Sequence, residues 1–297
     1  MISRAEEILK NTDVKYSRNV DIAGLSTMGI HSVAALVAEP DCKSRLVMLL
    51  KQFHSYGIPY RVVGGMSNIM PRSEYYSGVL VKTRNIAAKS VAENKITAEC
   101  GARLSQIVRT LTEYHLGAMA QLYHIPGTLG ASVRGNAGAH GLELSDVFES
   151  AEVYLVSEDR TVTFTKPQMN FGYRTSQLKL CDGVVLSATL NAAPRDPSQT
   201  KAEIEHFHEL RKSQPRGVCT LGSTFKRANG ISAGWYIDQC GLKGFSVGGA
   251  FVSEIHAGFI VNRGSATVND VLNLIDIVKK RVFSQFGILL EEEIDYL

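Results

Sequence analysis

One segment near the middle of the chain, residues 124–141, constrains the fold more than any other. It reads His-Ile-Pro-Gly-Thr-Leu-Gly-Ala-Ser-Val-Arg-Gly-Asn-Ala-Gly-Ala-His-Gly, with glycine or alanine at nearly every second position. Such a segment lacks the large side chains of an ordinary core, and it lets the backbone approach a neighbouring surface closely. It is therefore either a flexible surface loop or the wall of a site for a large, flat ligand.

The composition of this segment helps to choose between the two readings. It contains no Lys, Glu or Asp, which counts against a flexible loop. An isoalloxazine ring would suit such a wall. A second glycine-containing loop, residues 64–68, follows the strand-like run Ile58–Val63. Loops of this kind can turn several backbone N–H groups inward and hold a diphosphate, although a glycine pair after a strand is more often a simple turn.

The hydrophobic pattern predicts both helices and strands in the first two thirds of the chain. A helical pattern runs from Asp41 to Gly57, and another runs from Leu104 to His115. Short strand-like runs separated by turn residues surround the second helix. The predicted strands are 58–63, 78–82, 95–99, 151–156, 161–165 and 184–191, with a hairpin turn at residues 157–160.

A polar stretch, residues 194–201, has the composition of a linker, and a helix over residues 202–212 is predicted after it. The last third contains the most regular helical pattern, which begins at a capping box formed by Thr267 and Asp270 and stops at Gly287. Residues 248–251, 258–261 and 288–296 are predicted strands.

Several functions are disfavoured by the sequence. There is no Gly-x-Gly-x-x-Gly fingerprint and no Gly-Lys dipeptide for a P-loop. The net charge of +3 is spread evenly, which gives no support for a nucleic-acid or membrane partner. His206 and His208 are two apart on a helix and would diverge, so we expect solvated histidines and no metal site. Five widely spaced cysteines and the absence of a signal-like or membrane-spanning segment predict a cytoplasmic protein.

Two polar segments have side chains suited to acid-base chemistry or anion binding. Residues 171–176 place an arginine beside a tyrosine and two hydroxyls, and residues 222–227 place a serine near two cations. Taken alone, each is more often a surface turn than a site.

Taken together and in order, these segments resemble the UDP-N-acetylenolpyruvoylglucosamine reductase family, in its shorter form, from about Leu25 to Leu297. The most specific matches are residues 125–128, 136–139, 173–176, 222–226, 252–262 and 290–294. The resemblance implies an α+β protein with a two-part FAD-binding module of the vanillyl-alcohol-oxidase (PCMH) type, residues 1–83 and 84–200. It also implies a C-terminal α/β domain, residues 201–297, for a UDP-sugar enolpyruvyl ether.

The resemblance also assigns roles to residues, with FAD as cofactor and NADPH as hydride donor. Ser223 would donate a proton, and Arg174 and Glu293 would bind and polarise the substrate carboxylate. Tyr173, Lys226, Arg227 and His256 would bind the rest of the substrate. The flavin-binding positions would be Gly64, Gly65, Ser67, Asn68, Ile125, Pro126, Gly127, Thr128, Asn136, Ala137 and Gly138.

This chain departs from the family pattern at several glycines. Met66 stands where the family's phosphate loop has its second glycine, so a side chain there could obstruct the flavin diphosphate. His124, Ala131 and His140 also replace usual residues. Besides a divergent reductase, two hypotheses therefore remain: a homologue with weakened flavin binding that serves as a UDP-sugar-binding or regulatory protein, and a flavin oxidase, against which the intact Ser223, Arg174 and Glu293 argue.

Overall fold

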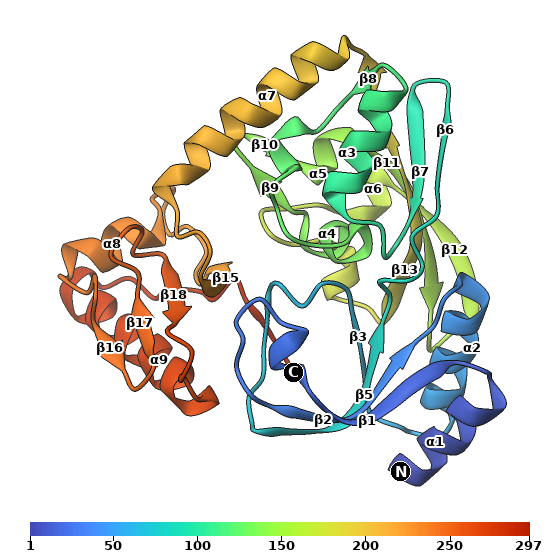
Figure 1. Cartoon of the computed structure of the whole chain (residues 1–297), viewed down its shortest axis with the longest axis horizontal. Helices are drawn as coiled ribbons and strands as arrows, with labels where there is room; N and C mark the ends of the chain where they lie inside the picture. The colour runs from blue at the N-terminus through green and yellow to red at the C-terminus, as the bar shows by residue number, and fades with distance from the viewer. The chain divides into compact units, whose positions relative to one another are not determined.

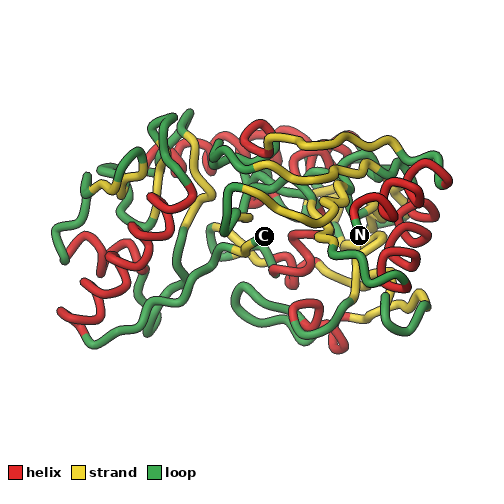
Figure 2. The backbone as a smooth tube through the Cα atoms, turned by 90° about the horizontal axis from the view of Figure 1, so that it is seen from below, coloured by secondary structure: helices red, strands yellow, loops and turns green.

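The computed structural model describes residues 1–297, and these form two compact units (Figure 1). The first unit comprises Met1–Arg18, Leu36–Gly65 and Gly78–Leu210, and the second comprises Asn19–Ala35, Met66–Ser77 and Arg211–Leu297. Helices and strands are mixed in both units, as the tube in Figure 2 shows. This agrees with the predicted α+β class.

The N-terminal part of the first unit packs two helices beside a small sheet. The helices are α1 (Ile2–Asn11) and α2 (Lys43–Ser55), and the sheet has the order β1-β2-β5-β3. Its strands are β1 (Lys15–Asp21), β2 (Val33–Glu39), β3 (Tyr60–Val63) and β5 (Tyr75–Lys82). The predicted helical face of α2 is confirmed, because Leu46, Leu49, Leu50 and Phe53 are fully buried.

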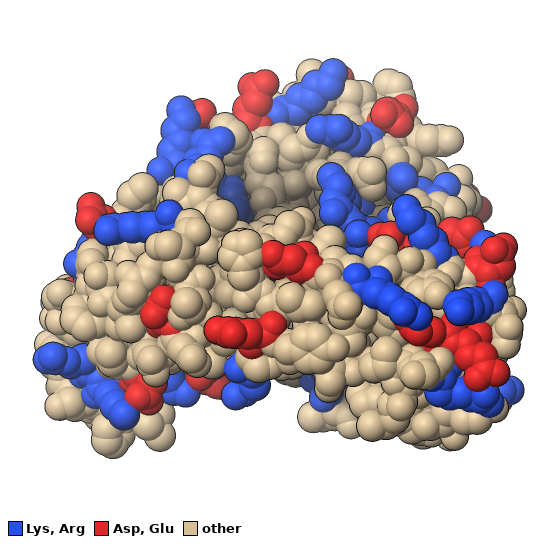
Figure 3. Space-filling model, turned by 60° about the horizontal axis from the view of Figure 1, so that its bottom comes forward, with Lys and Arg blue, Asp and Glu red and all other residues tan.

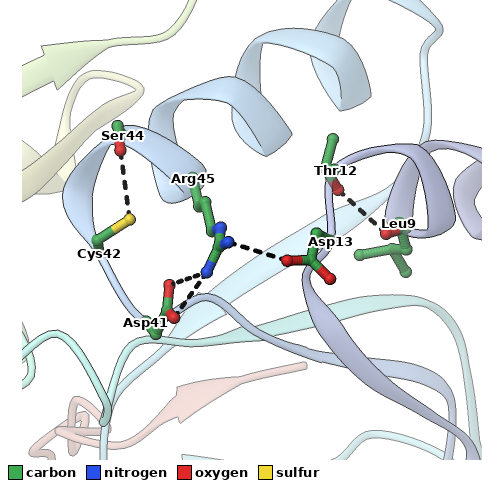
Figure 4. Close-up of polar contacts among 7 residues, drawn as sticks. All are labelled: Leu9, Thr12, Asp13, Asp41, Cys42, Ser44 and Arg45. Carbon is green, nitrogen blue, oxygen red and sulfur yellow. Dashed lines mark hydrogen bonds and ion pairs between the residues drawn. The ribbon is translucent and has the colours of Figure 1, made fainter.

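An arginine ties the start of α2 to the turn after α1 (Figure 4). Arg45 donates to both carboxylate oxygens of Asp41, at 2.8 and 2.7 Å, and to Asp13 at 3.1 Å. Thr12 closes the end of α1 by donating to the carbonyls of Ile8 and Leu9. The ion pairs of Arg45 lie at the surface, so they fix local geometry more than they stabilise the fold.

The larger part of the first unit is built on a five-stranded antiparallel sheet of order β12-β11-β13-β7-β6. Its strands are β6 (Lys89–Ala92), β7 (Lys95–Glu99), β11 (Phe148–Leu155), β12 (Arg160–Thr165) and β13 (Gly183–Asn191). The predicted strands in this region are therefore confirmed. Helices α3 and α4 contact β7, and α6 contacts β11 and β12 (Figure 1). Their bounds are α3 (Leu104–Glu113), α4 (Leu129–Gly135), α5 (Leu144–Val147) and α6 (Lys166–Met169).

Helix α7 (Pro197–Leu210) corrects one prediction, because it includes residues 197–201 of the expected linker. Asp196 accepts hydrogen bonds from the backbone N–H and the hydroxyl of Ser198, at 2.7 and 2.6 Å, and so caps the first turn. Pro197 fits the first helical position because its missing N–H is not needed there. The predicted boundary after residue 200 thus falls inside a helix, and the compact units divide instead after Leu210.

The histidines of α7 are only partly as expected. His206 is exposed, whereas His208 is half-buried and its ring centroid lies 5.0 Å from that of His124. His124 in turn has Nε2 within 3.2 Å of the carbonyl oxygen of Ile204. The histidine that replaces a family glycine therefore packs against α7.

The second unit contains an antiparallel sheet of order β15-β18-β17-β16 and the helices α8 (Ala233–Gln239) and α9 (Val268–Phe286). Its strands are β15 (Cys219–Ser223), β16 (Ser246–Val247), β17 (Ala250–Val252) and β18 (Phe259–Asn262). The capping box of α9 is confirmed: Asp270 N–H donates to Thr267 Oγ1 at 3.1 Å, and Thr267 N–H donates to Asp270 Oδ2 at 2.9 Å. Gly287 ends the helix at φ +68°.

Two strand predictions in this unit are wrong in detail. Gly248 and Gly249 form a hairpin turn before β17 because Gly248 takes φ +54° and any Cβ there would lie 2.4 Å from Asp270. The predicted last strand, residues 288–296, is mostly extended chain that does not belong to a sheet. Only β19 (Asp295–Tyr296) pairs as a strand, parallel to β4 (Ile69–Met70).

The remaining elements are short. They are β8 (Leu116–Gly117), β9 (Gly138–Ala139), β10 (Leu142–Glu143), β14 (Ala193–Pro194) and single 3₁₀ turns at Ile22–Gly24, Ala120–Leu122, Gln177–Lys179 and Arg211–Ser213. No helix is both long enough and apolar enough to cross a bilayer. Acidic and basic side chains are interspersed on the face drawn in Figure 3.

Candidate functional site

The small-residue segment folds into a helix and a hairpin. Thr128 is the residue before α4, and β9 and β10 pair directly after it. Leu129 and Val133 are fully buried, and α4 contacts β13 of the main sheet. The segment is therefore packed structure, and the alternative of a flexible surface loop is wrong.

Within the first unit, two of the predicted cofactor loops meet at Gly64 and Thr128. An ideal Cβ on Gly64 would lie 2.1 Å from Thr128 Oγ1, whereas one on Gly65 would meet only the Cα of Gly127, at 3.8 Å. Thr128 is 1% exposed, and its hydroxyl has no hydrogen-bond partner. A buried hydroxyl without a partner costs about 1–3 kcal/mol. A bare backbone face beside an unsatisfied hydroxyl fits a phosphate-bearing cofactor such as FAD.

We call the surface formed by Gly64 and Thr128 the cradle. Backbone hydrogen bonds fix its position. Leu129 N–H donates to the carbonyl of Ala102 at 2.8 Å, and Gly130 N–H donates to that of Cys100 at 2.9 Å. A Cβ on Gly130 would lie 3.0 Å from Cys100 Cβ, so the two backbones approach closely. The loop is thereby pinned to the end of β7. The burial of Cys100 raises the pKa of its thiol to about 12, so it stays neutral here.

The other half of the predicted phosphate loop belongs to the second unit. Asn68 uses its side-chain amide to donate to the carbonyl of Glu293 at 3.0 Å, and its own carbonyl accepts from Asp295 N–H at 2.9 Å. Met66 adopts φ +48° and is 3% exposed. It therefore takes the left-handed backbone conformation that a glycine adopts without strain, at a cost of about 1 kcal/mol.

Arg174 lies in a four-residue turn in which Gly172 and Thr175 exchange backbone hydrogen bonds of 3.1 and 3.2 Å. It takes φ +55°, and its guanidinium donates to the carbonyl of Gly138 at 2.8 Å. Tyr173 is 43% exposed, and its ring centroid lies 5.1 Å from the Arg174 guanidinium carbon. The structure therefore brings three predicted site residues, Tyr173, Arg174 and Gly138, together within the first unit.

Ser223 and the segment of Glu293 meet in the second unit through backbone pairing. Ser223 is exposed and ends β15, opposite Phe259 of β18. Directly after it, the carbonyl of Thr224 accepts from Glu293 N–H at 2.8 Å, and Lys226 N–H donates to the carbonyl of Glu291 at 2.8 Å. The backbone segments that carry Ser223 and Glu293, two residues predicted to be catalytic, thus lie side by side.

Two predicted substrate-binding residues of this unit, Lys226 and His256, do not both carry an unpaired positive charge. The ammonium of Lys226 forms an ion pair with Glu291. Burial lowers the pKa of His256, so its ring is neutral near pH 7. Because its Nδ1 accepts from Gly258 N–H at 3.1 Å, the proton sits on Nε2, which is therefore a donor.

Glu292 lies in a polar cluster with Lys279 and Tyr296. It accepts a hydrogen bond from Lys279 at 2.7 Å and another from the Tyr296 hydroxyl. Burial acts to raise the pKa of Glu292, but these two hydrogen bonds and the positive charges of Lys279 and Arg72 together outweigh it, so the pKa lies below its usual value. Burial, together with the carboxylate of Glu292, raises the pKa of Tyr296. Glu292 therefore stabilises the C-terminal segment that carries Glu293.

Replacing Glu292 with glutamine should lower the free energy of unfolding of the second unit by about 1 kcal/mol at pH 7, since the pair is partly exposed. A pKa lowered by folding gives stability that is complete above the unfolded value, about 4.3, and is lost as pH falls through the folded value. The difference between wild type and variant should thus shrink in acid.

Urea unfolding followed by the fluorescence of Trp235, the single tryptophan and a member of this unit, measures the effect of Glu292 at each pH. Asp276→Asn, which removes an exposed pair with Lys280, is the matched control and should change little. A Glu292→Gln effect that stayed constant between pH 7 and the acid limit of folding would contradict this account.

Comparison with known proteins identifies the family of this chain. A family model for the C-terminal domain of UDP-N-acetylenolpyruvoylglucosamine reductase matches residues 214–297, and an FAD binding domain model matches residues 34–165. A UDP-N-acetylenolpyruvoylglucosamine reductase of Caldicellulosiruptor bescii is 37% identical over 295 residues, which are 98% of this chain and 94% of the relative. The chain belongs to the UDP-N-acetylenolpyruvoylglucosamine reductase family. Its cofactor is FAD.

Other relatives give the same picture. A family member of Caldanaerobacter subterraneus is 36% identical, over 99% of this chain and 97% of its own. The crystal structure of the reductase (MurB) from Thermus caldophilus has a TM-score of 0.79 at 27% identity and covers 95% of this chain and 98% of that one. A carbohydrate oxidase from Microdochium nivale has a TM-score of 0.51 at 14% identity over 64% of this chain and 43% of its own, and that likeness concerns the fold alone. The predicted family and fold class are confirmed.

One candidate was missed in the sequence. Glu143 has an Oε1 atom 3.9 Å from the guanidinium of Arg174, yet no family motif drew attention to it. A local signal was present, because Glu143 and Asp146 have the spacing of a capping pair, and Glu143 N–H donates to Asp146 Oδ2 at 2.8 Å.

Proposed function

We propose that this chain reduces the enolpyruvyl double bond of UDP-N-acetylglucosamine-enolpyruvate to give UDP-N-acetylmuramate, with bound FAD and with NADPH as reductant, in peptidoglycan precursor synthesis. Family membership over nearly the whole chain supports the reaction class. The observation that supports the assignment of residues is the backbone pairing of Thr224 with Glu293, which brings together the segments that carry the proposed acid Ser223 and the proposed carboxylate-binding Glu293.

The chemistry that bound FAD supplies is transfer of a hydride from NADPH to the terminal vinyl carbon of the substrate. Negative charge then develops at the neighbouring carbon and its carboxylate. Ser223 gives its hydroxyl proton to that carbon, which completes the reduction and leaves an alkoxide to be reprotonated from solvent. Its exposure at the end of β15 suits contact with a substrate.

We assign the substrate carboxylate to Arg174 and Glu293. The planar guanidinium of Arg174 can donate two parallel hydrogen bonds to it. An anionic glutamate would repel the developing charge, so we propose that Glu293 is protonated, or shares a proton, while substrate is bound. Lys226, Arg227 and the Nε2–H group of His256 are assigned to the diphosphate, and Tyr173 is assigned to substrate binding.

The reaction predicts a change in colour. The purified protein should be yellow, and its flavin absorbance should bleach under anaerobic NADPH and return when the enolpyruvyl UDP-sugar is added. A colourless protein that FAD cannot reconstitute would favour a UDP-sugar-binding or regulatory role instead. Recovery of colour with oxygen but not with the UDP-sugar would favour an oxidase.

A further inference from the structure

Two polar residues that the mechanism leaves unused, Asn136 and Glu143, surround the guanidinium of Arg174. We propose that they are positioning residues, which together form a preformed socket that aims Arg174 at the substrate carboxylate. This inference rests on the proposed function, because it needs Arg174 to bind the substrate. All the residues that carry it lie in the first unit.

The backbone at Arg174 shows that its position is imposed by the surroundings. The residue occupies the third position of the turn Gly172–Thr175 with φ +55°, a left-handed conformation that glycine adopts more easily than other residues. For an arginine this costs about 1–2 kcal/mol, and such strain persists where neighbouring contacts determine the conformation. The contacts of the guanidinium and of the turn supply that determination.

The guanidinium is held by backbone oxygens. Arg174 Nη2 donates to the carbonyl of Gly138 at 2.8 Å, and Nη1 lies 3.5 Å from the carbonyl of Asn136. A Cβ on Gly138 would lie 3.1 Å from Arg174 Nη1 and 2.9 Å from the Cγ of Glu143. Only glycine lets the backbone and the two charged side chains approach this closely.

Asn136 links the turn to the rest of the socket. It is 1% exposed, and its Nδ2 donates to Glu143 Oε2 at 2.8 Å and to the carbonyl of Gly172 at 3.0 Å. Its Oδ1 accepts from Ser145 N–H at 3.0 Å. These bonds use both protons of the amide and its oxygen. A flavin contact by Asn136 would therefore have to come from its backbone.

Glu143 completes the socket with charge. Its Oε2 is fixed by Asn136, and its Oε1 lies 3.9 Å from Arg174 Nη1, beyond hydrogen-bond range. At this distance the carboxylate attracts the cation without occupying its N–H groups. Glu143 therefore orients the guanidinium through its charge.

Chemical rescue tests the socket. Arg174→Ala should lose turnover. Millimolar guanidinium chloride should raise the turnover of this variant at least tenfold by filling the preformed site. In Arg174→Ala/Glu143→Gln and Arg174→Ala/Asn136→Ala the rescue should fall tenfold or more. Arg174→Ala/Glu158→Gln is the control, since Glu158 lies in the exposed turn between β11 and β12 and pairs with Arg160, outside the socket, and its rescue should equal that of the parent.

With Arg174 present, Glu143→Gln should lower kcat for the UDP-sugar by about 10- to 100-fold through misorientation, with the rate of flavin reduction by NADPH unchanged. Glu143→Gln keeps the shape of the side chain and its bond from Asn136, and flavin content with thermal unfolding verifies folding. Equal rescue with and without Glu143 and Asn136, or no rescue of Arg174→Ala at all, would overturn the socket. Full turnover by Arg174→Ala would instead refute the role given to Arg174, and a wild type inactive on the UDP-sugar would refute the proposed function.

Discussion

Replacing Ser223 with alanine should lower turnover of the enolpyruvyl UDP-sugar by about 10²- to 10⁴-fold, the usual contribution of a general acid. Reduction of the bound flavin by NADPH should keep its wild-type rate, since that half of the reaction needs no proton from Ser223. Anaerobic stopped-flow spectroscopy follows both halves in the flavin absorbance, first with NADPH alone and then with the UDP-sugar.

The folding of the Ser223 variant is not expected to suffer. Ser223 is exposed, whereas Thr224 and Phe225 beside it are buried and anchor the strand end. Ser246→Ala, at an exposed strand position of the same unit, is the matched control and should leave both half-reactions intact. Equal slowing of both half-reactions by Ser223→Ala would point to a damaged flavin site and away from a proton donor.

Replacing Gly64 with alanine should weaken FAD binding by about 10- to 100-fold. The new methyl group would lie 2.1 Å from Thr128 Oγ1, and relief requires a shift of a buried side chain in the cradle. Overpacking of this kind costs about 1–3 kcal/mol, and each 1.4 kcal/mol is a factor of ten in affinity. Flavin content after purification and fluorescence titration of the apoprotein with FAD measure the effect.

Gly65→Ala separates a clash within the protein from a clash with the cofactor. Its methyl group would lie 3.8 Å from the nearest protein atom, Gly127 Cα, so the fold accepts it without strain. The midpoint temperature of thermal unfolding of the apoprotein should therefore be unchanged in Gly65→Ala and lowered in Gly64→Ala. If Gly65→Ala nevertheless loses FAD, the cofactor itself approaches that backbone. Wild-type FAD affinity in Gly64→Ala would show that the cradle lies elsewhere.

Much of the fold could be predicted because its signals are local. The start of α9 follows from Thr267 and Asp270, three residues apart, and its end follows from Gly287. The strands of the main sheet follow from alternating side chains between turn residues. The start of α7 was missed although Asp196 and Pro197 form a common helix start, because the polar composition around them suggested a linker.

The candidate site was also predictable only in part. The order of Arg174, Ser223 and Glu293 along the chain, with the glycine-rich loops before them, was sufficient to indicate the family. The unsatisfied hydroxyl of Thr128 could not be foreseen, since it depends on packing against Gly64. The hydrogen bond from Asn136 to Glu143 could not be foreseen either. The tertiary fold decides which residues become hydrogen-bond partners, and the composition does not show it.

The sequence by itself determined the helix ends, the buried faces and the ordered motifs that place this chain in its family, because each depends on residues a few positions apart. Only the tertiary structure gave the three consecutive glutamates different partners. Glu291 pairs with Lys226, Glu292 pairs with Lys279 and Tyr296, and Glu293 is tied through its backbone to Thr224. In an extended segment neighbouring side chains point to opposite sides, so their surroundings are set by the distant elements on each side.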